Sequence, residues 1–167
     1  MKQSAGILVY RKKGSGVEVL LAHPGGPFWA KKDVWSIPKG ELGDGEEALA
    51  AARREFEEEL GVLPPHGDVI ELGTTKQPGK INHIWAVEGD LDISKFQFGS
   101  LVKLQWPPRS GEYIEFPEND KAAWFDLAKA KTKLFKAQVD FIDRLVEKLG
   151  LTISEIDNKP PDQQTLL

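Results

Sequence analysis

Three glutamate side chains are spaced so that they could share a divalent cation. Glu55, Glu58 and Glu59 occupy positions i, i+3 and i+4 of a segment with helical patterning, which predicts that their carboxylates lie side by side. Clustered carboxylates repel one another, and a divalent cation relieves that repulsion; such hard oxygen ligands suit Mg²⁺ or Mn²⁺. Glu57 points about 160° away from Glu55 on a helical wheel and is predicted to be solvated. The alternative is a solvent-exposed helix rich in glutamate and arginine, which the acidic face taken by itself favours.

The loop before this helix adds groups that a metal and phosphate site would need. Its glycines let the backbone approach a metal closely, so the Gly40 carbonyl is a candidate neutral ligand. Lys39 stands at the loop entrance, where an ammonium could hold a phosphate oxygen. Arg54 can pair with Glu58 at i+4 or orient Glu55 through a bidentate contact.

The complete pattern is Gly, five residues, Glu, seven residues, and then Arg-Glu-apolar-any-Glu-Glu-any-Gly-apolar. Residues 40–62 meet every position of it. At ordinary residue usage, an accidental match anywhere in this chain has odds on the order of one in a million. The whole pattern therefore favours the metal site over the plain surface helix.

Periodicity and turn residues predict the elements that must position these groups. A helix is expected over 46–60, with Leu49, Ala52, Phe56 and Leu60 on its buried face and Gly61 ending it. A second helix is expected over 134–149. Strands are expected at 4–10, 17–22, 34–37, 69–75, 81–88, 101–105 and near 121–125, with a polar loop at 39–45. This order favours an α/β fold in which helices cover the faces of a mixed sheet.

Composition and charge limit the class of protein. The chain has 167 residues, of which 40% are hydrophobic and 29% charged, as expected for one globular domain. The net charge of −4 argues against a nucleic-acid partner held by bulk positive charge. There is no cysteine, which excludes thiolate metal sites and a cysteine nucleophile. No apolar run is long enough to span a membrane, and a cytoplasmic location is expected. A domain over 1–150 and a polar C-terminal tail over 151–167 are predicted.

Residues 40–62 resemble the Nudix box, the signature of the Nudix hydrolases, and every defining position matches. Phe56 is the mildest departure, because the family usually has an aliphatic residue there. The order of elements from about residue 4 to residue 149 also resembles the Nudix fold. The resemblance implies an α/β/α sandwich with a mixed β-sheet, in which the box forms a loop-helix-loop.

Nudix hydrolases cleave a nucleoside diphosphate linked to another moiety, by attack of water on phosphorus with two or three divalent cations. For this chain the resemblance implies Mg²⁺ or Mn²⁺ held by the Gly40 carbonyl and by Glu55, Glu58 and Glu59. It further implies that Glu55 or Glu58 takes the proton from the attacking water, that Arg54 orients Glu55, and that Glu46 has a supporting role. This agrees with the chemistry argued from the residues, since metals lower the pKa of water and neutralise a polyphosphate.

Many family members add a carboxylate from a late loop that precedes a strand with a tryptophan. Glu118, six residues before Trp124, is the candidate for this additional metal ligand. Glu112 and Glu115 are competing candidates.

Smaller resemblances bear on the substrate. Residues 35–40 resemble the Pro-Lys-Gly entrance of diadenosine tetraphosphate hydrolases, and Lys80 stands where those enzymes carry a basic residue facing the phosphates. Those enzymes commonly stack the base on a tyrosine, and this chain has Ala122 at that position. The candidates for a substitute stacking partner are Phe28, Trp29 and Trp106. Arg109 is a candidate phosphate clamp.

The favoured function is Mg²⁺-dependent hydrolysis of diadenosine tetraphosphate to ATP and AMP. The alternatives within the class are ADP-ribose, nucleotide sugars, damaged nucleoside triphosphates, inositol pyrophosphates and the 5′ end of RNA, the last disfavoured by the net acidity. A catalytically idle domain that binds a nucleotide or a protein is the alternative of another class, and the intact set of box carboxylates counts against it. The expected partner is a small-molecule nucleotide, and the sequence leaves the oligomeric state open.

Overall fold

The computed structural model describes residues 1–151 of the chain, and of the predicted tail only Leu151 falls within that range. Its strands are β1 (Lys2–Lys13), β2 (Gly16–Pro24), β3 (Lys39–Glu41), β4 (Ile70–Gln77), β5 (Lys80–Glu88), β6 (Leu101–Gln105), β7 (Tyr113–Pro117) and β8 (Asn119–Asp126). Its helices are α1 (Ala48–Leu60), α2 (Leu127–Lys133) and α3 (Val139–Leu149), with short 3₁₀ turns η1 (Ile93–Lys95) and η2 (Lys136–Gln138). None of the helices in this range is long and apolar enough to cross a membrane.

A mixed sheet forms the centre of the molecule. Its strand order is β4-β5-β1-β2-β8, and β3 also pairs with β1. β1 and β5 run parallel, whereas the remaining neighbours are antiparallel. β1 is buried without interruption from Ser4 to Tyr10, as expected for a central strand whose two faces are both covered.

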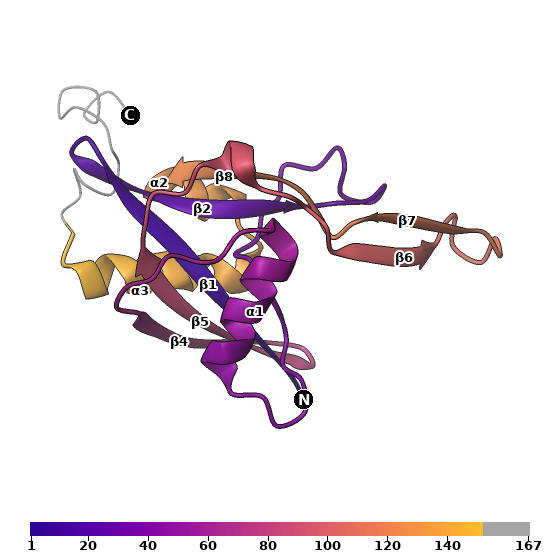
Figure 1. Ribbon diagram of the computed structural model, residues 1–167, viewed down its shortest axis with the longest axis horizontal. Coiled ribbons are helices and arrows are strands. Elements are labelled where there is room, and N and C mark those ends of the chain that lie inside the picture. The colour runs from indigo at the N-terminus through magenta and orange to yellow at the C-terminus, as the bar shows by residue number, and fades with distance from the viewer. Residues whose placement is uncertain (152–167) are drawn as a thin grey trace.

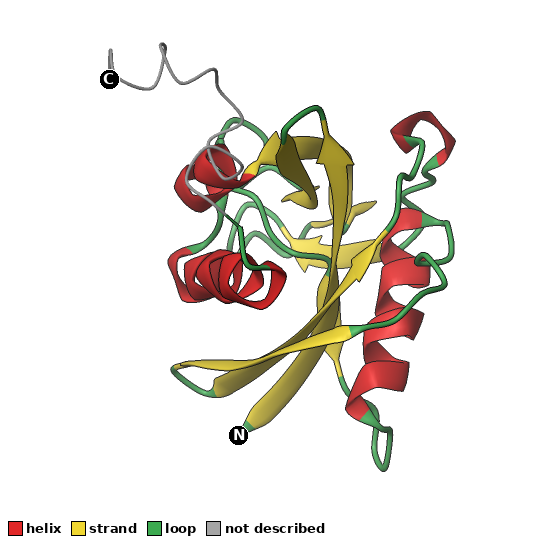
Figure 2. Ribbon diagram, turned by 90° about the vertical axis from the view of Figure 1, so that its left-hand side faces the viewer, coloured by secondary structure: helices red, strands yellow, loops and turns green. Residues whose placement is uncertain are grey.

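Helices cover both faces of this sheet (Figure 2). On one face α1 packs against the sheet through Phe56 and Leu60, which are fully buried. On the other face α2 and α3 pack through a second cluster that includes Phe141, Ile142 and Leu145. The protein is therefore the α/β/α sandwich that the sequence predicted.

The α1 helix begins at Ala48, two residues later than predicted. The delay arises because Glu46 still belongs to the preceding turn, where its N–H donates to the Gly43 carbonyl at 3.1 Å. The helix ends as predicted at Gly61, whose φ of 72° lies in the left-handed region that glycine adopts without strain.

Two of the predicted elements were wrong in their extent. Residues 34–37 make only isolated bridges, between Ala22 and Ser36 and between Trp35 and Leu134. The predicted helix over 134–149 begins only at Val139, and α2 precedes it as a separate helix that the sequence did not predict. The break follows from the backbone of Trp35, which donates to the Lys133 carbonyl at 2.8 Å and accepts from the Phe135 N–H at 3.1 Å. These long-range bonds draw the segment out of a helical path.

Two short strands were also missed. β3 lies in the predicted polar loop at 39–45, and its pairing with Ser4–Gly6 of β1 is a tertiary contact without a local β pattern. β7 pairs only with β6, and together they form a two-stranded ribbon that projects from the body of the molecule (Figure 1). This ribbon places residues 101–117 beside the loop that follows β2.

Candidate functional site

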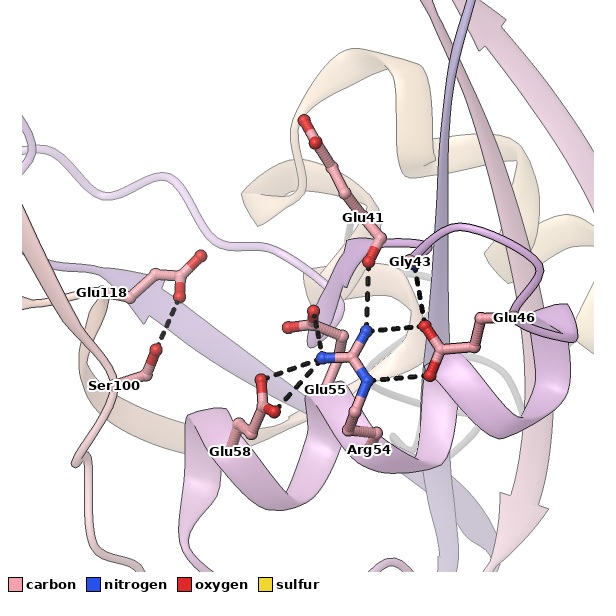
Figure 3. Close-up of polar contacts among 8 residues, drawn as sticks. All are labelled: Glu41, Gly43, Glu46, Arg54, Glu55, Glu58, Ser100 and Glu118. Carbon is pink, nitrogen blue, oxygen red and sulfur yellow. Dashed lines mark hydrogen bonds and ion pairs between the residues drawn. The ribbon is translucent and has the colours of Figure 1, made fainter.

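Arg54 gathers three carboxylates around one guanidinium (Figure 3). Its Nε and Nη2 donate to the two oxygens of Glu46 at 2.8 and 2.9 Å. Its Nη1 donates to Glu55 at 2.9 Å and to Glu58 at 3.1 Å, so Arg54 contacts both predicted partners, but its bidentate contact is with Glu46 and not with Glu55. The bonds to Glu46 above all raise the pKa of Arg54. Arg54, followed by the N–H of Gly43, lowers the pKa of Glu46 to about 2.

Gly40 lies against the carboxylate of Glu55, because β3 carries it past the inner side of α1. A Cβ at this position would stand 2.1 Å from the Cδ and Oε2 atoms of Glu55. Only glycine leaves room for that carboxylate. The Glu55 side chain is 13% exposed, and burial raises its pKa against the opposing effect of Arg54. Two residues that were predicted to be metal ligands therefore lie next to each other.

Glu58 and Glu59 do not share one surface as predicted. The Glu58 side chain is 51% exposed, whereas Glu59 is buried, with 4% of its surface exposed. The Asn119 side chain at the start of β8 lies close enough to Glu59 to lower its pKa slightly against the other effects. Burial, and then the nearby carboxylates of Glu118 and Glu55, raise the pKa of Glu59 well above its ordinary value. The surroundings of Glu59 therefore destabilise its ionised form relative to its neutral form.

Glu118 joins β7 to β8 and faces the carboxylates of α1 (Figure 3). Its Oε2 accepts from Ser100 Oγ at 3.0 Å, and its N–H donates to the Ser100 carbonyl at 2.7 Å. Its charge contributes to the raised pKa values of both Glu55 and Glu59. The competing Glu112 and Glu115 are exposed on the ribbon. The geometry thus favours Glu118 as the late-loop carboxylate.

The donors at this site fit a hard divalent cation. The carboxylates of Glu55, Glu59 and Glu118 and the carbonyl of Gly40 are all oxygen ligands of the kind that Mg²⁺ prefers. Among residues 1–151, no group of three or more acidic or imidazole side chains is already arranged to hold one ion. Arg54 takes up Glu55 and Glu58, so a cation would have to compete with its guanidinium for these oxygens.

Lys39 and Lys80 lie near each other beside the carboxylates. Burial, and then the nearby Lys80, lowers the pKa of Lys39 to about 8. Neither lysine has an ion pair within the part of the chain that the structure describes. A polyphosphate between them would relieve their repulsion, which is the role that the sequence suggested for both.

The other two candidates for substrate binding lie in different surroundings. Trp29 packs edge to face on Phe28 and on Phe135, with ring centroids 4.8 and 5.1 Å apart. It also lines a cavity that reaches Glu118. Arg109 is exposed in the loop that joins β6 to β7, and among residues 1–151 it forms no ion pair with the carboxylates of the site.

The burial of Glu59 predicts an effect on stability that depends on pH. Its pKa is raised in the folded chain, so the metal-free protein loses free energy of unfolding as the pH rises from about 4.5 through the folded pKa. Glu59→Gln removes this loss, so the free energy of unfolding of the variant should rise relative to that of the wild type between pH 4.5 and 7.5. Urea unfolding in EDTA at both pH values measures the difference. If the difference in free energy of unfolding between the two proteins is the same at both pH values, the pKa of Glu59 is not raised by folding.

Comparison with known proteins identifies the family. The family model described as NUDIX domain matches residues 1–145. The chain belongs to the NUDIX domain family. This confirms the resemblance drawn from residues 40–62, and the match covers almost all of the residues that the structure describes.

Two relatives illustrate the sequence likeness. The chain is 30% identical over 132 residues to Nudix hydrolase 7 of Arabidopsis thaliana, covering 72% of this chain and 44% of that protein. It is 38% identical over 119 residues to the RNA pyrophosphohydrolase of Stenotrophomonas maltophilia (strain K279a), covering 65% of this chain and 56% of that protein. The chain therefore spans about half the length of these curated relatives.

Solved structures of other NUDIX proteins share the fold. The Ap4A hydrolase of C. elegans, in a binary complex, superposes with a TM-score of 0.58 at 18% identity, over 90% of this chain and 98% of that one. The NUDIX domain of Shewanella oneidensis NrtR, complexed with ADP ribose, superposes with a TM-score of 0.60 at 16% identity, over 88% of this chain and 87% of that one. At such identities the likeness establishes the fold alone.

Two side chains of the site had no signal in the sequence. Ser100 holds Glu118, and Asn119 lies beside Glu59, although neither belongs to the 40–62 pattern. Asn119 directly follows the candidate Glu118, which is the one hint that could have found it.

Proposed function

We propose that this NUDIX protein is a divalent-metal-dependent pyrophosphohydrolase that acts on nucleoside polyphosphates. The supporting observation is the juxtaposition of two opposed charge clusters. The carboxylates of Glu59 and Glu118 lie close enough to Lys39 to affect its pKa, and so does the ammonium group of Lys80. Cations would neutralise the acidic cluster, and the lysines would hold the phosphates that those cations carry.

The residues divide the chemical work as follows. Glu55, Glu58, Glu59, Glu118 and the Gly40 carbonyl would hold two or three Mg²⁺ or Mn²⁺ ions. Bound divalent cations lower the pKa of water and offset the charge of the polyphosphate. Glu58, exposed at the edge of the cluster, accepts the proton of the attacking water, with Glu55 as the alternative acceptor. Arg54 fixes the position of both carboxylates, and Glu46 fixes Arg54.

Diadenosine tetraphosphate, cleaved to ATP and AMP, is the substrate we favour. Two resemblances to diadenosine tetraphosphate hydrolases support it. Residues 35–40 resemble their Pro-Lys-Gly entrance, and Lys80 stands where they carry a basic residue facing the phosphates. ADP-ribose, nucleotide sugars and nucleoside triphosphates share the pyrophosphate bond and are the alternatives. The 5′ end of RNA is a further candidate, because a relative at 38% identity is named an RNA pyrophosphohydrolase. A cytoplasmic protein acting on small nucleotides fits the absence of cysteine.

A substrate panel tests this proposal. Each candidate is incubated with the protein and Mg²⁺, and the values of kcat/KM are compared. Diadenosine tetraphosphate is expected to rank first, and EDTA is expected to abolish turnover. A higher kcat/KM for ADP-ribose or for 5′-triphosphorylated RNA would contradict diadenosine tetraphosphate as the preferred substrate and would still support metal-dependent hydrolysis of a pyrophosphate bond. Nucleotide binding without turnover of any substrate would point to the idle domain.

A further inference from the structure

An apolar cavity of about 250 Å³ opens beside the carboxylate cluster. One wall is the loop after β2, and the other is the base of the β6–β7 ribbon. Its lining includes Phe28, Trp29, Val102, Leu104, Phe116 and Glu118. Glu118 is the one ionisable side chain of this lining, and it also belongs to the proposed metal site. The cavity is therefore continuous with the place where the phosphates would be cleaved.

The two walls are held together by close backbone packing. Gly25 donates its N–H to the Glu118 carbonyl at 2.9 Å. Gly26 has a φ of 92°, and a Cβ there would stand 2.5 Å from the ring of Phe116. The loop therefore sits directly on the ribbon, and the position of Phe116 in the cavity is defined by both segments.

The register of the ribbon places four apolar side chains on one face. Val102 lies opposite Phe116, and Leu104 lies opposite Ile114. The other face carries Lys103 opposite Glu115 and Gln105 opposite Tyr113, with the pair Leu101 and Pro117 at one end of the ribbon. The apolar face turns towards the cavity, because Val102, Leu104 and Phe116 line it. Tyr113, at 61% exposure, lies on the opposite face and provides a matched control.

We infer that this cavity binds the nucleobase of the substrate and accepts different bases about equally. The inference rests on the proposed function, since the cavity adjoins the proposed metal ligand Glu118. Three aromatic rings and two aliphatic side chains suit a flat, uncharged ring. Apart from Glu118, the indole N–H of Trp29 is the one hydrogen-bonding group among the side chains of this lining. Stacking tolerates any base, because every base has a π-face.

Binding of a product-like ligand tests this without turnover. Titration calorimetry with Mg²⁺ compares AMP and GMP with ribose 5-phosphate, which lacks only the base. AMP and GMP are expected to bind within about 3-fold of each other, and each about 5- to 150-fold more tightly than ribose 5-phosphate. Phe116→Ala should remove most of this preference, whereas Tyr113→Ala should keep it. Leu104→Ser, at a position 40% exposed, gives the same test with little risk to folding.

The outcomes separate the cavity from the proposed function. Equal binding of AMP and ribose 5-phosphate by the wild type would overturn the inference. A preference that survives both Phe116→Ala and Leu104→Ser would overturn it as well, and strong selection of AMP over GMP would overturn the base tolerance. A protein that shows the expected preferences yet hydrolyses no substrate would support the cavity and refute the pyrophosphohydrolase.

Discussion

Glu58→Gln is expected to lower kcat by about two to four orders of magnitude while the fold is kept. The amide is nearly isosteric with the carboxylate, but it neither accepts a proton from water nor offsets a cation. The Glu58 side chain is 51% exposed and pairs with Arg54, so the free energy of unfolding should change by no more than about 1 kcal/mol. Steady-state turnover of diadenosine tetraphosphate and thermal unfolding of the same samples measure both quantities.

Glu57→Gln is the matched control for this variant. Glu57 stands next in the sequence, on the same helix, and is exposed as its place on the helical wheel predicted. The same change of charge at this position should leave kcat within about 3-fold of the wild type, because exposed charges at a distance are screened. Equal losses in the two variants would mean that overall charge matters and that Glu58 has no special place in the chemistry.

Gly40→Ala is the second variant with a large expected effect. The added methyl group would lie 2.1 Å from the Glu55 carboxylate, so either that carboxylate or β3 must move. Gly40 pairs with Ala5 of the central strand, which is fully buried, and this favours displacement of Glu55. A catalytic group misplaced by about 1 Å costs on the order of 100-fold in rate, and we expect kcat/KM to fall by about that factor.

Gly43→Ala controls for the loss of a glycine in the same loop. A Cβ at Gly43 meets its nearest atom, Oε1 of Glu46, at 3.4 Å, which is an ordinary contact. Its activity should stay within a few-fold of the wild type. A Gly40→Ala variant that is as active as Gly43→Ala would show that the contact between Gly40 and Glu55 does not position the carboxylate.

The sequence predicted the α1 site well because its constraints are local. The helical spacing of Glu55 and Glu58 and the glycine that ends the helix depend on neighbours within two turns, so the pattern alone places them. The different fates of Glu58 and Glu59 were not predicted. The wheel puts both at the border of the apolar stripe, and only the packing of α1 against the sheet and Asn119 decides which is buried.

The remaining differences all involve contacts between distant segments. The pairing of β3 with β1, the bonds of Trp35 that divide the second helix, and the ribbon that carries Phe116 each join residues far apart in the chain. The proximity of Lys39 and Lys80 is of the same kind, since β3 and β5 both pair with β1. Periodicity and turn chemistry describe single segments, so they leave such pairings undetermined.

Hydrolysis of diadenosine tetraphosphate in ¹⁸O-labelled water with Mg²⁺ tests the central claim most directly. Attack of water on phosphorus should give ATP and AMP in equal amounts, with one ¹⁸O atom in one of the two products at each turnover. The labelled product identifies the phosphorus that is attacked, and EDTA should stop the reaction. Folded protein that binds the substrate but gives neither product with Mg²⁺ or Mn²⁺ would contradict the account, as would products that form without ¹⁸O.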